Sequence, residues 1–351
     1  MALAAFALLS ALWAALVRIG WSLPALPVPI AGQHGPLMIA GFLGTLISLE
    51  RVVALRWRWA YSAPLLSGLG ALALLVGLPP WLGRGLIALG SAGLAIMFVR
   101  MVRMHSAAYV ATMALGAWMW LAGNLLWWFD WAIARVFPWW AGFLILTIAG
   151  ERLDLARVMA PGRASRIAFT LAVGLFLAGL LISLAEMRFG LVVGGAGLIG
   201  LGAWLARNDI ARRTIRKAGL TRFIAACLLP GYAWLIAGGA LWLAFGGTAT
   251  AGFLYDAMLH SLFLGFVFSM IFGHAPIIIP AVMNIEIVYR PFFYAHLALL
   301  HVSLIARVIG DLTLNLPLRM WGGLFNVIAL LIFLGVMASS ARRRPAAMTT
   351  S

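Results

Sequence analysis

The chain has 351 residues, of which 64% are hydrophobic and only 10% are charged, and its mean hydropathy is +1.05. Soluble domains carry about 25% charged residues, so this composition excludes a soluble protein and points to a lipid bilayer as the partner. The net charge of +16 is expected to set membrane topology rather than to bind nucleic acid, and the single cysteine, Cys227, excludes a disulfide framework or a cysteine metal cluster.

Windows of about 17–25 apolar residues mark helices that can cross the hydrocarbon core of a membrane. The expected fold class is therefore an all-α membrane protein with twelve transmembrane helices. These form one polytopic membrane domain over residues 1–341, followed by a basic and polar cytoplasmic tail over residues 342–351. The expected helices cover residues 2–17, 27–49, 60–79, 85–102, 107–128, 133–150, 167–185, 189–206, 221–245, 251–275, 291–309 and 321–339.

The basic residues follow a strict alternation along these windows. Of the 25 Lys and Arg residues, 19 follow the even-numbered windows and only 6 follow the odd-numbered ones. Lys and Arg are retained on the cytoplasmic side of a membrane because their translocation is costly. The sequence therefore predicts a multi-pass membrane protein with both termini in the cytoplasm.

A short motif recurs in the second, sixth and tenth windows. Residues 41–51 read GFLGTLISLER, residues 142–152 read GFLILTIAGER, and residues 265–275 read GFVFSMIFGHA. The spacing predicts a three-fold pseudo-repeat of four helices, with units of roughly 1–104, 105–206 and 207–341, around an axis normal to the membrane. Chance recurrence in so apolar a chain is the alternative. The Glu-Arg pairs at 50–51 and 151–152 are expected to anchor helix ends rather than to perform chemistry.

Ionisable side chains inside membrane spans are costly and are therefore candidates for function. His34 and His260 lie about 10 Å and about 13 Å into two parallel windows, at nearly equal depth. This is the arrangement in which two imidazoles bind opposite faces of a heme iron. Asp256, one turn before His260, is expected to accept the other ring N–H. The alternative is that each histidine makes a polar contact between helices.

The remaining histidines are candidates for a second metal site. His274 lies 14 residues after His260, about 21 Å along the helix, and so cannot bind the same metal ion. Together with His296 or His301, which are five residues apart, it is a candidate for a second heme or a copper ion. Met38, one turn after His34, is a candidate thioether ligand, although methionine in a membrane core more often serves packing.

Two segments resemble a known family. The string HGPLMIAGF at 34–42 resembles the His-x3-Met-x2-Gly-Phe element of the NnrS family, and LLHVSLIARVIGDL at 299–312 is similar to the C-terminal region of that family. The resemblance implies a twelve-helix bacterial membrane protein that contains heme and copper and is linked to nitric oxide stress and denitrification. The family's Gly-His-Thr-Gly-Arg element is replaced here by GHAPI at 273–277, which leaves the role of His274 open.

More distantly, the predicted topology is similar to that of the catalytic subunit of heme–copper oxidases and nitric oxide reductases. In those proteins, histidines of the second and tenth helices bind the low-spin heme, and His34 and His260 match those helices. The chain lacks their His-x-His pair at His260 and has no histidine in its sixth and seventh windows. The usual binuclear centre that reduces dioxygen is therefore not expected.

Three functions remain open at this point. The first is an NnrS-like heme protein that binds nitric oxide or a related diatomic ligand. The second is a divergent heme–copper oxidase-like reductase that takes electrons from a quinol or a cytochrome. The third is a proton-coupled transporter without a cofactor, in which the histidines relay protons. Whether the protein is an enzyme depends on which of these is correct, and the optical spectrum of the purified protein separates the heme proteins from the transporter.

Overall fold

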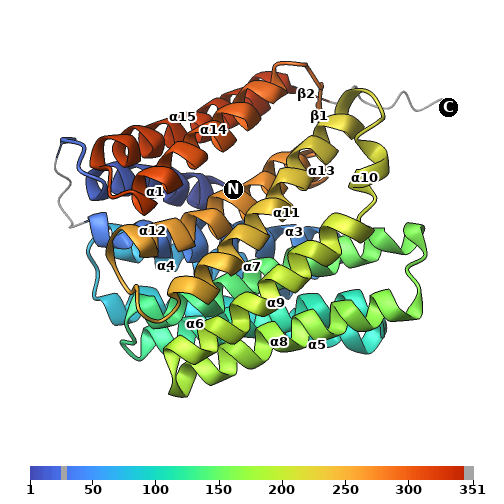
Figure 1. Ribbon diagram of the computed structural model, residues 1–351, viewed down its shortest axis with the longest axis horizontal. Coiled ribbons are helices and arrows are strands. Elements are labelled where there is room, and N and C mark those ends of the chain that lie inside the picture. Colours follow the sequence, from blue (N-terminus) through green and yellow to red (C-terminus); the bar gives the residue numbers. More distant parts are fainter. Residues whose placement is uncertain (25–29, 344–351) are drawn as a thin grey trace.

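The computed structural model describes residues 1–24 and 30–343, and these residues are almost entirely helical (Figure 1). Ten helices within these ranges are long and apolar enough to cross a membrane, so the protein is a multi-pass membrane protein. They are Ile30–Leu55, α5 (Pro80–Met104), α6 (Ala108–Trp128), α7 (Ile133–Ala156), α8 (Arg163–Ala185), α9 (Met187–Asn208), α11 (Gly219–Phe245), Gly252–Met283, α14 (Phe293–Leu312) and α15 (Leu316–Ser340).

Two of the twelve predicted windows form shorter helices. The first is α1 (Ala2–Arg18), with 17 residues. The window at 60–79 becomes a 3₁₀ turn, η3 (Arg58–Tyr61), followed by α4 (Ser62–Leu75), which has only 14 residues. The helix stops early because Gly77 adopts a left-handed conformation with φ of 77° and two prolines follow it. A straight helix needs about 20 residues to cross the hydrocarbon core, so α1 and α4 are shorter than a full crossing.

The helices that carry His34 and His260 share an unusual construction. The first consists of η1 (Ile30–Gln33), α2 (His34–Pro36), the π-helix η2 (Leu37–Gly44) and α3 (Thr45–Leu55). The second consists of α12 (Gly252–His260), the π-helix η5 (Ser261–Phe268) and α13 (Ser269–Met283).

When the sequences are aligned on their Gly-Phe pairs, η2 and η5 begin and end at the same aligned positions. The middle copy of the motif, in α7, is ordinary α-helix. Only the first and third copies therefore share this feature. π-Helical segments are rare and frequently mark functional sites.

The core of the bundle is α7, which runs through the middle of the molecule while α14 and α15 pack together along one flank (Figure 1). On the other side, α8 and α9 approach each other very closely. A Cβ atom added to Gly179 of α8 would lie 2.3 Å from the backbone nitrogen of Gly194 in α9. Small residues permit this contact because no side chain keeps the two backbones apart. Close packing of this kind helps to hold helices together in lipid, where the hydrophobic effect between helices is absent.

Ion pairs connect the helix ends that carry the Glu-Arg sequences. The Arg51 guanidinium pairs with the Glu151 carboxylate and lies 3.7 Å from Glu50, so α3 and α7 end on the same side of the bundle. Arg152 lies 3.5 Å from the buried Asp209. This arrangement is consistent with the structural role expected of these residues, and it fits parallel orientations of the second and sixth windows.

The C-terminal tail differs from the prediction. Ala341–Arg343 forms a short strand, β2, that pairs antiparallel with β1 (Ile285–Ile287), so residues 342 and 343 of the predicted tail are held against the end of the bundle. The prediction overlooked this pairing because three-residue strands carry no hydrophobic periodicity. Residues 344–351 lie outside the described residues. Helix α13 continues through both of its prolines to Met283 and delivers the chain directly to β1.

Candidate cofactor site

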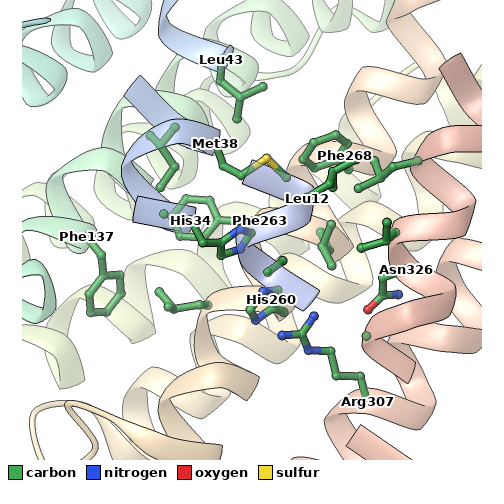
Figure 2. Close-up of a pocket in the computed structure, with 18 of the residues that line it drawn as sticks. Leu12, His34, Met38, Leu43, Phe137, His260, Phe263, Phe268, Arg307 and Asn326 are labelled. Carbon is green, nitrogen blue, oxygen red and sulfur yellow. The ribbon is translucent and has the colours of Figure 1, made fainter. Parts of the chain in front are cut away.

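His34 of α2 and His260 of α12 lie directly beside each other (Figure 2). Their ring centroids are 6.2 Å apart and the ring planes differ by only 11°. The two residues are 226 positions apart in the sequence; His260 directly precedes the π-helix η5, and His34 lies three residues before the start of η2. The expected proximity of the two imidazoles is therefore confirmed.

Hydrogen bonds fix the tautomer of both rings. The Nδ1 atom of His34 lies 2.9 Å from the carbonyl oxygen of Ala11 in α1, and Nδ1 of His260 lies 2.8 Å from the carbonyl oxygen of Asp256. A carbonyl oxygen only accepts, so each Nδ1 must carry the proton and each Nε2 must present a lone pair. No side chain or backbone group of the described residues donates a hydrogen bond to either Nε2. Each ring therefore presents an acceptor nitrogen to its surroundings, and a neutral imidazole in this form is the one that binds a metal ion.

The separation of the rings suits a single metal ion between them. Metal–imidazole bonds are about 2 Å long and a ring nitrogen lies about 1 Å from its centroid, so two imidazoles on opposite sides of one metal have centroids about 6 Å apart. Among the described residues, no group of three or more His, Cys, Asp or Glu side chains could hold a metal ion. The chain therefore offers two strong ligands, and the other coordination positions would have to come from a cofactor.

Two cavities meet at the histidine pair. The first is almost wholly apolar, and its space free of protein atoms, open mouth included, is about 760 Å³. The second is more polar, measures about 1280 Å³ in the same way, and is lined by Arg18, Asp256 and Arg319. Six residues line both cavities: His34, Gly35, Ile133, Tyr255, Leu259 and His260. The rings therefore stand at the junction of an apolar slot and a charged one.

A buried network of charges supports His260. Arg307 of α14 donates two hydrogen bonds to the Asp256 carboxylate, at 2.8 and 3.1 Å. Arg319 of α15 lies 3.5 Å from the same carboxylate and 2.9 Å from that of Asp311. The predicted role of Asp256 is only partly correct. Its carboxylate is 3.4 Å from His260 Nδ1, whereas its backbone carbonyl makes the shorter contact.

Sequence reasoning missed the two arginines of this network. Arg307 and Arg319 were counted only as topological charges after the eleventh window. The available signal was that Arg307 lies in the middle of an apolar helix, where an ionisable group is usually paired. Arg18, the last residue of α1, was likewise counted only for topology, and it lines the polar cavity.

The other predicted ligands are placed differently. Met38 is buried and lines the apolar cavity above His34 (Figure 2), whereas His274 lines a separate cavity and bonds through Nδ1 to the carbonyl oxygen of Met270. His301 accepts a hydrogen bond of 3.1 Å from the Trp234 indole. His296 is surrounded by phenylalanine rings with centroids 4.7 to 6.2 Å away, those of Phe223, Phe272, Phe293 and Phe333. Within the described ranges, no close ring pair joins any two of these three histidines.

Comparison with known proteins gives one match, which spans nearly the whole chain. The model of the family described as a domain of unknown function, DUF8744, matches residues 1–342. The chain belongs to this family. No curated protein and no solved structure matches it. The matched range includes the histidine pair, both cavities and the charge network.

The charge network leads to a stability prediction. Asp256→Leu leaves Arg307 buried without its main partner, and we expect it to lower the free energy of unfolding by about 3–5 kcal/mol. The double variant Asp256→Leu/Arg307→Met removes both charges and should recover most of that loss. Thermal unfolding in detergent, followed by tryptophan fluorescence, measures both effects. A double variant no more stable than Asp256→Leu alone would show that the pair is not the source of the effect.

Proposed function

We propose that the protein is an integral membrane heme protein in which His34 and His260 are the two axial ligands of the iron. The observation that carries the proposal is the pair of unprotonated Nε2 atoms on nearly parallel rings 6.2 Å apart. A metal ion would satisfy both lone pairs at once, and a porphyrin would supply the four ligands that the chain lacks.

The two cavities fit the chemistry of a heme. The apolar cavity suits the hydrocarbon edge of a macrocycle, with Phe263, Phe268 and Phe137 among its walls (Figure 2). The polar cavity suits the propionate groups, because Arg18 and Arg319 line it and arginine binds carboxylates strongly. Gly35 lies between the two cavities, and a Cβ atom placed on it would meet no atom within 4 Å. The backbone therefore leaves space for a flat group beside His34.

Two histidine ligands leave no open position on the iron, so we propose that the site carries electrons. A heme held in this way supplies reversible one-electron chemistry. The chain orients both imidazoles through Ala11 and Asp256, with apolar side chains on one side of the rings and a polar cavity on the other. The resemblance to the NnrS family adds a setting for this activity, the response to nitric oxide or denitrification.

The finer topology belongs to the same proposal. We propose twelve spans, with α1 and α4 as short ones, in the bacterial inner membrane and with both termini in the cytoplasm. The matched π-helices η2 and η5 and the Arg51–Glu151 ion pair support parallel second, sixth and tenth helices. These are the orientations that a repeat of four helices requires.

A copper(I) ion is the second candidate occupant of the site. Met38 lines the same apolar cavity as both imidazoles, and a thioether with two imidazoles suits copper(I). The surrounding cavities favour heme, since a single ion needs neither the apolar slot nor the arginines.

The optical spectrum tests the heme proposal directly. We expect the purified protein, expressed with adequate heme, to show an intense Soret band, because a bis-histidine heme absorbs strongly in that region. His34→Ala and His260→Ala should each abolish or greatly reduce the band, since each removes one of two ligands. His105→Ala, at an exposed histidine that ends α5, should leave it unchanged. A colourless protein that contains stoichiometric copper would favour the copper site instead.

Carbon monoxide tests whether both axial positions are held by the chain. The reduced wild-type protein should show little shift of its Soret band on addition of carbon monoxide, because both positions are filled. Any heme retained by His34→Ala should bind the gas and shift the band. A large shift in the wild-type protein would contradict the electron-carrier proposal and favour a heme that binds nitric oxide or another diatomic ligand.

Gly35 provides a test of the space around the ligands. Gly35→Leu should fold, because nothing crowds a side chain there, but it should lose most of the heme by filling the cavity. Gly335→Leu on α15 is the matched control, since Gly335 also has open space and lines neither cavity at the histidine pair. Heme content per protein, measured by the pyridine hemochrome assay, separates the two. Equal heme in both variants would place the cofactor elsewhere.

A further inference from the structure

A third cavity, here called the distal cavity, lies beyond the π-helices, on the side where α3 and α7 end. Its space free of protein atoms, open mouth included, is about 1080 Å³, and its walls come from α1, η2, α3, α7, η5, α13 and α15. Nearly all of its lining residues are apolar. The polar exceptions are Glu50, Thr147, Glu151 and His274. An apolar cavity with a few polar groups is typical of a site for a small organic ligand.

His274 presents an unsatisfied acceptor at this cavity. Its Nδ1 atom lies 2.6 Å from the carbonyl oxygen of Met270, so Nδ1 carries the proton and Nε2 has a free lone pair. That Nε2 atom is buried and has no hydrogen-bond partner among the described residues. Buried acceptors are normally satisfied, so the missing partner is expected to be a ligand with an N–H or O–H group.

The charges around the cavity restrict that ligand. Glu50 and Glu151 both line it, and Arg51 is shared between them. Arg152, which follows Glu151, lies 3.5 Å from Asp209. Two carboxylates with one arginine between them disfavour a ligand that carries a carboxylate or a phosphate. A neutral ligand with a hydroxyl group fits better, and the carboxylates are available to take its proton.

A single layer of side chains separates the distal cavity from the apolar cavity at the histidine pair. Phe42 lines the distal cavity and Phe268 lines the apolar cavity, and the two rings stack with centroids 6.3 Å apart. Leu43 lines both cavities. A ligand in the distal cavity would therefore lie close to the proposed heme, with two aromatic rings in the wall between them.

We propose that this cavity binds a lipid-soluble hydroquinone. One ring hydroxyl donates a hydrogen bond to His274 Nε2, and the isoprenoid tail lies along the apolar walls. Binding of the hydroquinone does not depend on the heme. The transfer of its electrons rests on the proposed function. Oxidation of one hydroquinone would break its two O–H bonds, form a quinone and supply one electron to the proposed heme in each of two copies of the protein. The two protons would pass to His274 Nε2 and to the Glu50 carboxylate.

The test uses decylubiquinol, a hydroquinone with a short saturated tail, and the full-length protein in lipid nanodiscs under anaerobic conditions. We expect saturable binding in equilibrium dialysis. His274→Phe keeps a planar ring but removes the acceptor, and should weaken binding about tenfold. His105→Phe changes an exposed histidine that lines neither cavity and should bind as the wild-type protein does. Decanol, which has a tail and a hydroxyl but no ring, should compete poorly.

Three results would overturn the proposal: no saturable binding to the wild-type protein, equal binding to His274→Phe, or equal competition by decanol. Electron transfer has its own readout, since decylubiquinol should reduce the Soret-absorbing heme of the wild-type protein faster than that of His274→Phe. His260→Ala separates the two proposals because it should lose the heme but still bind decylubiquinol. A wild-type protein that binds decylubiquinol without containing heme would remove the proposed function and leave this site standing.

Discussion

The structure depends on two backbone carbonyl oxygens that each take the Nδ1 proton of a membrane-embedded histidine. Ala11 holds His34 in this way and Asp256 holds His260, across two different helix contacts. With Nδ1 committed, each ring has only the acceptor Nε2 left to offer, and the bundle brings the two rings within 6.2 Å of each other. A neutral imidazole whose Nδ1 proton is held by a carbonyl oxygen is the form that binds a metal through Nε2. The cavities, the arginines and the π-helices are all arranged around that pair.

Much of this arrangement could be predicted from the sequence. Hydropathy located every long helix, and the alternation of Lys and Arg gave parallel orientations to the second and tenth windows, which put His34 and His260 at similar depth. The sequence could not show how each helix is rotated about its own axis, and therefore which neighbouring helix a given side chain faces. The π-helix after each histidine changes that rotation, and no hydropathy pattern reveals it. The short length of α4 was also hidden, because the apolar residues continue beyond the glycine that ends the helix.

Counting arginines to orient a membrane protein can hide those that belong to a buried site. The number of Lys and Arg residues that follow each window is sufficient to orient this chain. Arg307 and Arg319 nevertheless lie against Asp256 and Asp311, so the same residues help to hold α12, α14 and α15 together. A buried ion pair of this kind contributes more to a defined arrangement than to net stability. In this bundle it holds the backbone that positions His260.

The two π-helices carry a consequence for how the halves of these membrane spans can vary. Each wide turn accommodates an additional residue relative to an α-helix, so the helix beyond it is turned by about 100° with respect to the part before it. Because η2 and η5 occupy equivalent places, both long helices make this rotation at the same depth, and their mutual contact through Phe42 and Phe268 is preserved. The part of each span that holds an imidazole and the part that holds Glu50 or His274 therefore face different neighbours from those that an uninterrupted α-helix would give them.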